Sequence, residues 1–232
     1  MRHPFSNRSE AGHLLARHLA KEIAGPNLLV VALPRGGVVV GNEVSSYLEV
    51  PLEILIVRKI GAPHQPELAL GAVASRGEKY LNQRLISQLK VSEEEINSVV
   101  VRESAEVLRR EKIYGKSVGI PELSGKKVLI VDDGIATGAT VKVAIQALRK
   151  GEPSYLALAV PVASLNSIES LSRLVDRCFV LQTPEEFDAV GDFYESFPPV
   201  SDDEVVSLLK EARARLHHGI RHDDKTRSID ST

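Results

Sequence analysis

One stretch constrains the fold of this chain more than any other: an apolar run that ends in two carboxylates and a glycine-rich loop. Val128–Val131 is followed by Asp132 and Asp133, then by Gly-Ile-Ala-Thr-Gly-Ala-Thr, after which a helical pattern begins at once. A continuous apolar run of this kind is typical of a strand buried on both faces of a parallel sheet. Ligands of open α/β sheets bind at the carboxyl ends of the strands, so the loop is expected to line a binding crevice.

The residue types of this loop suit an anion. Gly134 and Gly138 permit a tight turn and a close approach of the backbone to a ligand. Thr137 and Thr140 offer hydroxyl donors, and the N–H groups of the helix start carry roughly half a positive charge from the helix dipole. Two aspartates would repel a phosphate, whereas paired acceptors beside it suit the vicinal hydroxyls of a sugar. The expected ligand is therefore a ribose 5-phosphate unit.

The pattern acidic-acidic-Gly-x-x-Thr-Gly-x-Thr after an apolar strand resembles the phosphoribosyl-pyrophosphate (PRPP) motif of the type I phosphoribosyltransferases. The resemblance implies that Asp132 and Asp133 hold the ribose and that the following loop holds the 5-phosphate. The loop residues are Gly134, Ile135, Ala136, Thr137, Gly138, Ala139 and Thr140. The alternative is a turn that is glycine-rich for geometry alone, although neighbouring buried carboxylates are costly without a partner. A Walker A motif fits worse, because Ala139 stands where that motif needs a lysine.

A second loop has the setting of an anion site. The apolar run Leu28–Leu33 reads as a strand, Pro34-Arg35-Gly36-Gly37 follows it, and Val38–Leu48 reads as a helix. Glycines expose backbone N–H groups, and the guanidinium of Arg35 offers a fork of donors suited to phosphate. This segment resembles the pyrophosphate loop of the family, which implies that Arg35, Gly36 and Gly37 contact the pyrophosphate. A plain strand-to-helix turn with a surface arginine is the alternative.

Two basic residues end the next expected strand, Pro51–Val57. Arg58 and Lys59 point in opposite directions if the strand continues, so one of them is expected to reach the site. The family often brings a basic residue from this region to the pyrophosphate, and we expect Lys59 to be that residue. A solvated charge is the alternative. The polar stretch Gly61–Glu67 is expected to be a loop, and it resembles the flexible loop that closes over PRPP in the family.

Strands and helices alternate through most of the chain, which predicts an α/β fold with a doubly wound parallel sheet. We expect this core over residues 27–181 and a hood built from residues 1–26 and 182–216, which in the family selects the acceptor. Aromatic side chains between Phe187 and Phe197 are expected either to floor an acceptor pocket or to form the core of the hood. One domain is thus expected over residues 1–216, followed by a polar, flexible tail over 217–232.

Composition narrows the class of protein. A formal net charge of −2 argues against a dedicated nucleic-acid or membrane-surface protein. Cys178 is the only cysteine, so no internal disulfide is possible and a reducing, cytoplasmic location is expected. Because no apolar run approaches the roughly 20 residues of a membrane-spanning helix, no membrane association is expected.

The resemblance implies transfer of a phosphoribosyl group from PRPP to a nitrogen nucleophile, a nucleobase or similar small molecule, with release of pyrophosphate. The residues expected to carry the reaction are Asp132, Asp133, Arg35 and Lys59. Mg²⁺ is expected as a hard cation bound mainly through PRPP, so no metal ligand is assigned to the protein. Two other functions stay open: a non-catalytic regulator that binds PRPP or a nucleotide, and a phosphate-ester hydrolase, for which Asp132-Asp133 lacks the usual D-x-D spacing. Whether the chain forms a homodimer is also open.

Overall fold

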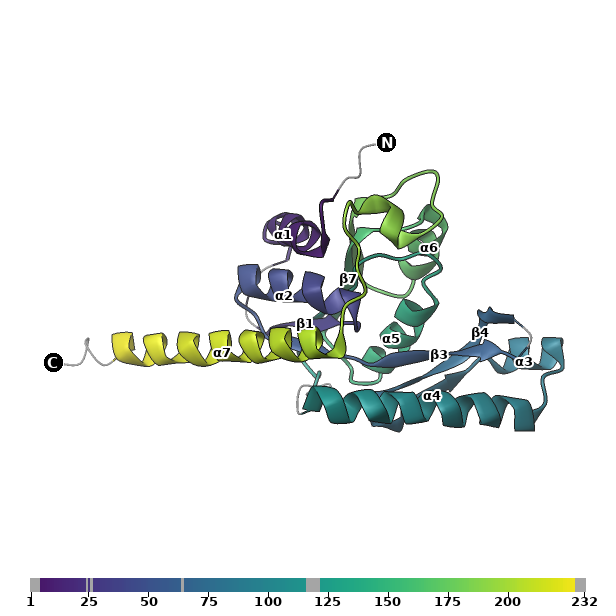
Figure 1. The fold of residues 1–232 in the computed structure, drawn as a ribbon. Helices are drawn as coiled ribbons and strands as arrows, with labels where there is room; N and C mark the ends of the chain where they lie inside the picture. Colours follow the sequence, from purple (N-terminus) through teal and green to yellow (C-terminus); the bar gives the residue numbers. More distant parts are fainter. Residues whose placement is uncertain (1–4, 24, 26, 64, 116–121, 228–232) are drawn as a thin grey trace.

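The centre of the protein is a five-stranded parallel sheet with the strand order β2-β1-β6-β7-β8 (Figure 1). The computed structural model describes residues 5–23, 25, 27–63, 65–115 and 122–227. The strands are β1 (Leu28–Ala32), β2 (Leu52–Ile54), β6 (Lys127–Val131), β7 (Tyr155–Val162) and β8 (Arg177–Gln182). All four neighbouring pairs are parallel, which confirms the predicted doubly wound parallel sheet.

Helices cover both faces of this sheet, and the alternation of side chains along each strand explains why. In β1 and β6, Val30 and Leu129 belong to the apolar cluster formed with α1 (Arg8–Leu19), α2 (Gly36–Leu48) and α7 (Asp202–Arg227). Their neighbours Val31 and Ile130 belong to the cluster on the other face, with α5 (Ala139–Arg149) and α6 (Leu165–Leu171). Successive side chains of a strand point to opposite faces, so a run that is apolar throughout needs cover on both.

A second, antiparallel sheet corrects two of the predictions. It consists of β3 (Val57–Ala62), β4 (Gln65–Ala74) and β5 (Lys79–Leu81), flanked by the short 3₁₀ helix η1 (Ser75–Gly77) and by α3 (Gln83–Leu89) and α4 (Glu93–Tyr114). The predicted strand Pro51–Val57 is wrong, because β2 ends at Ile54 and β3 begins at Val57 in the other sheet. The residues on both sides of the break are buried and apolar (Leu52, Ile54, Leu55, Ile56 and Val57), so the break has no signature in composition.

The predicted loop Gly61–Glu67 is wrong as well. Strand β3 continues to Ala62 and β4 begins at Gln65, while residue 64 lies outside the described residues. The pairing of β3 with β4 shifts in register at Gly61, an irregularity that a glycine accommodates. Cross-strand hydrogen bonds order this polar segment, and they depend on a partner strand that local sequence does not reveal.

The N-terminal segment meets the segment that follows β8. Phe5 forms a parallel bridge with Tyr194, which follows the 3₁₀ helix η3 (Val190–Phe193). Phe5, Ala11, Val162 and Tyr194 form a third apolar cluster, against which Phe187, Phe193 and Phe197 pack. The aromatic segment between Phe187 and Phe197 therefore has core contacts.

Helix α7 packs against α2, α4 and β2, and its C-terminal part extends away from the sheet (Figure 1). It runs to Arg227 and so includes residues 217–227 of the predicted polar tail. The residues after Leu216 include no proline, and Lys, Arg and His are compatible with a helix, so polarity alone did not mark its end. Of the predicted tail and hood, residues 1–4, 24, 26 and 228–232 lie outside the described residues. In the part of the chain that the structure describes, no helix combines the length and apolarity needed to cross a membrane.

Candidate active site

The two predicted anion loops lie against each other at the carboxyl ends of the neighbouring strands β1 and β6. A β-carbon added to Gly36 would lie 1.8 Å from Oδ2 of Asp133, and one added to Gly37 would lie 2.8 Å from Oδ1 of Asp132. Leu33 also donates its N–H to the carbonyl of Val131 at 3.0 Å. The absence of a side chain at Gly36 and Gly37 is therefore what permits the acid pair and the second loop to form one site.

The two aspartates of the pair differ in their surroundings. Oδ1 of Asp132 accepts the backbone N–H of Asp133 at 2.9 Å. Burial raises the pKa of Asp132 well above its usual range, and the charge of Asp133 adds to the rise, whereas the guanidinium of Arg8 opposes it. Asp132 therefore resists ionisation, as expected of two adjacent acids held out of water.

Arg8 is a site residue that sequence reasoning missed. Its Nε lies 2.7 Å from Oδ2 of Asp133, and its Nη1 donates to the carbonyl of Pro198 at 2.7 Å. The guanidinium carbon lies 3.5 Å from the ring centroid of Phe197, and the residue is only 8% exposed. Tyr194 adds a hydrogen bond from its hydroxyl to the carbonyl of Asp133 at 2.6 Å. Nothing in the sequence near Arg8 indicates a contact 125 positions away, because such contacts depend on how the hood folds.

The loop from Gly134 to Thr140 is anchored on one side and open on the other. Ile135 donates its N–H to the carbonyl of Val162 at 3.0 Å. The carbonyl of Ala136 accepts the hydroxyls of Ser164 at 2.6 Å and Ser167 at 2.5 Å. Thr137 is exposed at the point where the chain enters α5.

Gly138 caps α5 in the left-handed region, with φ of 70°, a conformation that favours glycine. Ala139 and Thr140 begin the helix, so their N–H groups belong to the first turn, which has no intrahelical acceptors. The arrangement has the free donors and the positive dipole end that a phosphate requires.

Arg35 lies at the start of α2, where it precedes Gly36. Its side chain is 41% exposed, and its Nη1 lies 3.9 Å from Oδ1 of Asp202, the first residue of α7. The hydroxyl of Tyr114 donates to the same carboxylate at 2.6 Å, and this bond above all lowers the pKa of Asp202. Arg35 thus lies in the loop whose glycines contact the acid pair, while its side chain lies near the start of α7.

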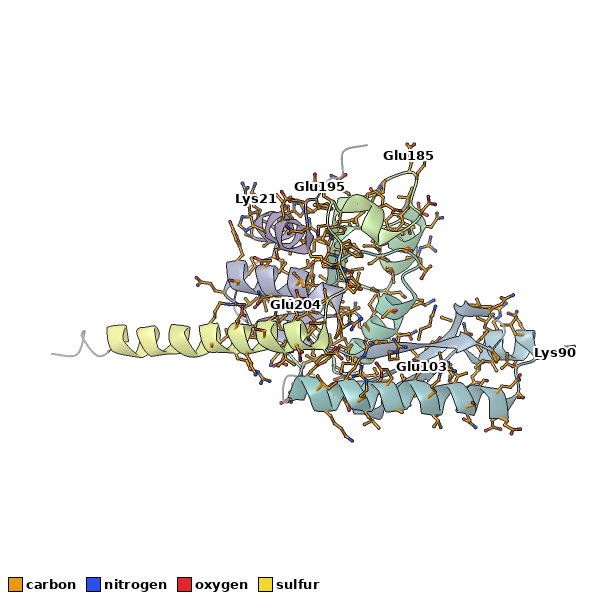
Figure 2. All side chains as sticks on the ribbon, in the orientation of Figure 1. Lys21, Lys90, Glu103, Glu185, Glu195 and Glu204 are labelled. Carbon is orange, nitrogen blue, oxygen red and sulfur yellow. The ribbon has the colours of Figure 1, made fainter. Side chains whose placement is uncertain are left out.

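Lys59 lies on β3 and lines a cavity of about 430 Å³ whose wall also includes Thr140 of the loop from Gly134 to Thr140. Arg58 lines the same cavity and is held by Glu103 at 2.9 Å; Glu103 lies on α4, on the side that faces β3 (Figure 2). Both basic residues therefore border the same cavity as Thr140. Arg35 and the two aspartates are not among the residues that line it.

Known proteins share both the sequence pattern and the fold. Residues 7–195 match the family described as phosphoribosyl transferase domain, which covers most of the chain. The chain belongs to this family, as its PRPP motif indicated.

A protein of Mycobacterium tuberculosis strain CDC 1551, named provisionally as a phosphoribosyl transferase, is 39% identical over 208 residues. The aligned region covers 90% of this chain and 47% of that relative, so the chain spans about half of its length. The bifunctional protein pyrR of Enterococcus faecalis is 29% identical over 152 residues, which covers 62% of this chain and 75% of the relative. The crystal structure of TT1426 from Thermus thermophilus is similar with a TM-score of 0.79 and 36% identity, and the match covers 91% of this chain and 99% of the other.

Proposed function

We propose that the protein transfers the phosphoribosyl group of PRPP to a nitrogen nucleophile, a nucleobase or similar small molecule, and releases pyrophosphate. The observation that carries the proposal is the contact of Gly36 and Gly37 with Asp133 and Asp132. It joins a second glycine-rich loop to a ribose-binding acid pair and a phosphate loop. PRPP presents the same sequence of groups, with a phosphate at one end, hydroxyls in the middle and a pyrophosphate at the other end.

In this reaction the bond from C1 of the ribose to the pyrophosphate oxygen breaks, and a bond from C1 to the acceptor nitrogen forms with inversion. The transition state resembles an oxocarbenium ion, so positioning and charge neutralisation supply most of the rate. We assign the ribose hydroxyls to Asp132 and Asp133 and the 5-phosphate to residues 134–140. Arg35 and Lys59, both at the margins of the site, take up charge on the leaving pyrophosphate.

We propose that Mg²⁺ accompanies PRPP. A hard cation prefers phosphate and hydroxyl oxygens and keeps much of its water, so PRPP itself would supply most of the ligands and neutralise the leaving group. Among the described residues, no group of three or more His, Cys, Asp or Glu side chains is placed to hold a metal ion. We assign no metal ligand to the protein, and we propose a cytoplasmic location on the basis of its single cysteine.

The test is release of pyrophosphate from PRPP in the presence of individual nucleobases, with and without Mg²⁺. We expect release that needs one base or a small group of bases and that falls when Mg²⁺ is chelated. Arg35→Gln should lower kcat/KM for PRPP roughly 10-fold or more, because it removes a charged donor to the leaving group. Arg17→Gln, an exposed change on α1, is the matched control.

Two other outcomes would replace the proposal. Tight calorimetric binding of PRPP without pyrophosphate release by any base would favour a non-catalytic PRPP-binding regulator. Cleavage of a simple phosphomonoester without PRPP would favour a phosphate-ester hydrolase.

A further inference from the structure

The acid pair has one fixed cationic partner among the described residues, and that partner comes from outside the sheet. The side chains of Arg8 and Asp133 are 10% and 15% exposed, so their contact at 2.7 Å is a desolvated ion pair. The groups with charge or a titratable proton that face Asp132 are Asp133 in the same loop, Arg8 of α1 and Tyr194 of the hood. Two adjacent carboxylates in a poorly solvated site repel each other when both are ionised. A cation beside them offsets the energy of that repulsion.

Arg8 is held in place by contacts that do not depend on a ligand. Pro198 accepts from its Nη1, and the ring of Phe197 lies under its guanidinium. Tyr194 stacks on Phe197 with 4.8 Å between ring centroids and binds the backbone of Asp133 through its hydroxyl. A guanidinium fixed on three sides in this way is pre-organised and loses little freedom when the acids bind a substrate.

Arg8 uses one of the two oxygens of the Asp133 carboxylate. Its Nε donates to Oδ2 at 2.7 Å. An ionised carboxylate has about four acceptor positions, so Oδ1 remains able to accept a ribose hydroxyl while Arg8 stays bound to Oδ2. Arg8 is thus placed to orient the acid and does not have to leave before the ribose binds.

We propose that Arg8 is a positioning residue: it is the built-in counter-charge that keeps the ribose-binding acid pair oriented and able to accept the ribose hydroxyls. The inference rests on the proposed PRPP site, and it makes the folding of the hood a condition for PRPP affinity. Since α1 carries this guanidinium and Phe197 and Pro198 contact it, the hood affects the ribose site as well as any acceptor pocket.

The pH dependence of PRPP binding separates this role from simple support of the hood. Burial and Asp133 raise the pKa of Asp132, and Arg8 opposes that rise, so removing Arg8 should push the pKa of Asp132 higher. The ionised pair binds the hydroxyls best. Affinity for PRPP should therefore rise with pH in the wild type, and in Arg8→Gln the same rise should occur at higher pH, with affinity about tenfold weaker near pH 7.

The experiment is a calorimetric titration of the purified protein with PRPP between pH 6 and pH 9, comparing wild type, Arg8→Gln, Arg8→Lys and the exposed control Arg17→Gln. Arg8→Lys keeps the positive charge but loses the several N–H donors of the guanidinium. This variant should therefore bind PRPP more weakly, with a pH profile near that of the wild type. Arg17→Gln should match the wild type. Melting curves establish that each variant is folded.

A folded Arg8→Gln protein whose affinity changes without a shift of the pH profile, or does not change, overturns the inference. If Arg8→Gln does not fold, Phe197→Ala decides: it removes the ring under the guanidinium and should shift the profile in the same direction by less, and an unshifted profile overturns the inference. A wild-type protein that binds no PRPP at any pH would instead overturn the proposed function and this inference together.

Discussion

Asp132→Asn and Asp133→Asn should each lower kcat/KM for PRPP by roughly 10–100-fold, because each replaces a carboxylate oxygen that we propose accepts a ribose hydroxyl. The same two substitutions should change stability in opposite directions. Their effects on turnover and on the melting temperature are therefore measured together, by pyrophosphate release and by thermal unfolding. The exposed change Glu169→Gln on α6 serves as the control for both.

Asp132→Asn should stabilise the protein at neutral pH. The pKa of Asp132 is raised in the folded state, so between the unfolded pKa and the raised value the folded protein holds more protons than the unfolded chain. Wild-type stability therefore falls as pH rises through this window, and the neutral amide avoids that loss. The increase in the free energy of unfolding that Asp132→Asn causes should be absent near pH 4 and should grow as the pH rises above that value.

Asp133→Asn should destabilise the protein by about 3 kcal/mol, because it leaves the buried guanidinium of Arg8 without its counter-charge. For a chain of this size that corresponds to a fall in melting temperature of roughly 6–12 °C. Equal shifts of melting temperature in the two variants, or wild-type turnover in either, would contradict this description of the acid pair.

Gly36→Ala should lower kcat/KM for PRPP about 100-fold, since a displacement of roughly 1 Å in a reacting site can have that effect. The new β-carbon would lie 1.8 Å from Oδ2 and 2.6 Å from Cγ of Asp133, and 2.9 Å from Nε of Arg8. Asp133 would have to move, and its contact with Arg8 would be broken or rebuilt. Kinetics of pyrophosphate release give the measurement.

The matched control is Gly41→Ala on the same helix. Its β-carbon would lie 2.9 Å from that of Ala32 and 3.3 Å from Cδ1 of Leu52, so it disturbs packing against the sheet and not the acid pair. It should lower the melting temperature and leave the KM for PRPP unchanged. Wild-type kinetics in Gly36→Ala, or an equal rise of KM in both variants, would show that the two loops do not form one site.

Much of the core could be predicted because its local patterns are unambiguous. An apolar run such as Val128–Val131 can be stable only with cover on both faces, and the observed β6 has that cover. Helix α4 begins at a capping box of Ser92 and Glu95, whose hydrogen bonds are local and therefore have a signature in the sequence. Asp132, Gly36 and their neighbours meet because parallel strands bring their carboxyl ends to one edge of the sheet.

The remaining features depend on contacts between distant parts of the chain. The break between β2 and β3 falls inside a buried stretch, and the order of Gly61–Ala62 comes from pairing with β4. Arg8 stands in an ordinary amphipathic helix, and only the folded hood brings it to Asp133. Local sequence contains no signal for such pairings, because their stability comes from tertiary packing.

A crystal structure of the protein with PRPP and Mg²⁺ tests the central claim most directly. We expect the 5-phosphate within hydrogen-bonding distance of the N–H groups of residues 137–140, the ribose hydroxyls on Asp132 and Asp133, and Arg8 still bound to Asp133. No PRPP at the two loops, or PRPP bound elsewhere on the protein, would contradict that claim.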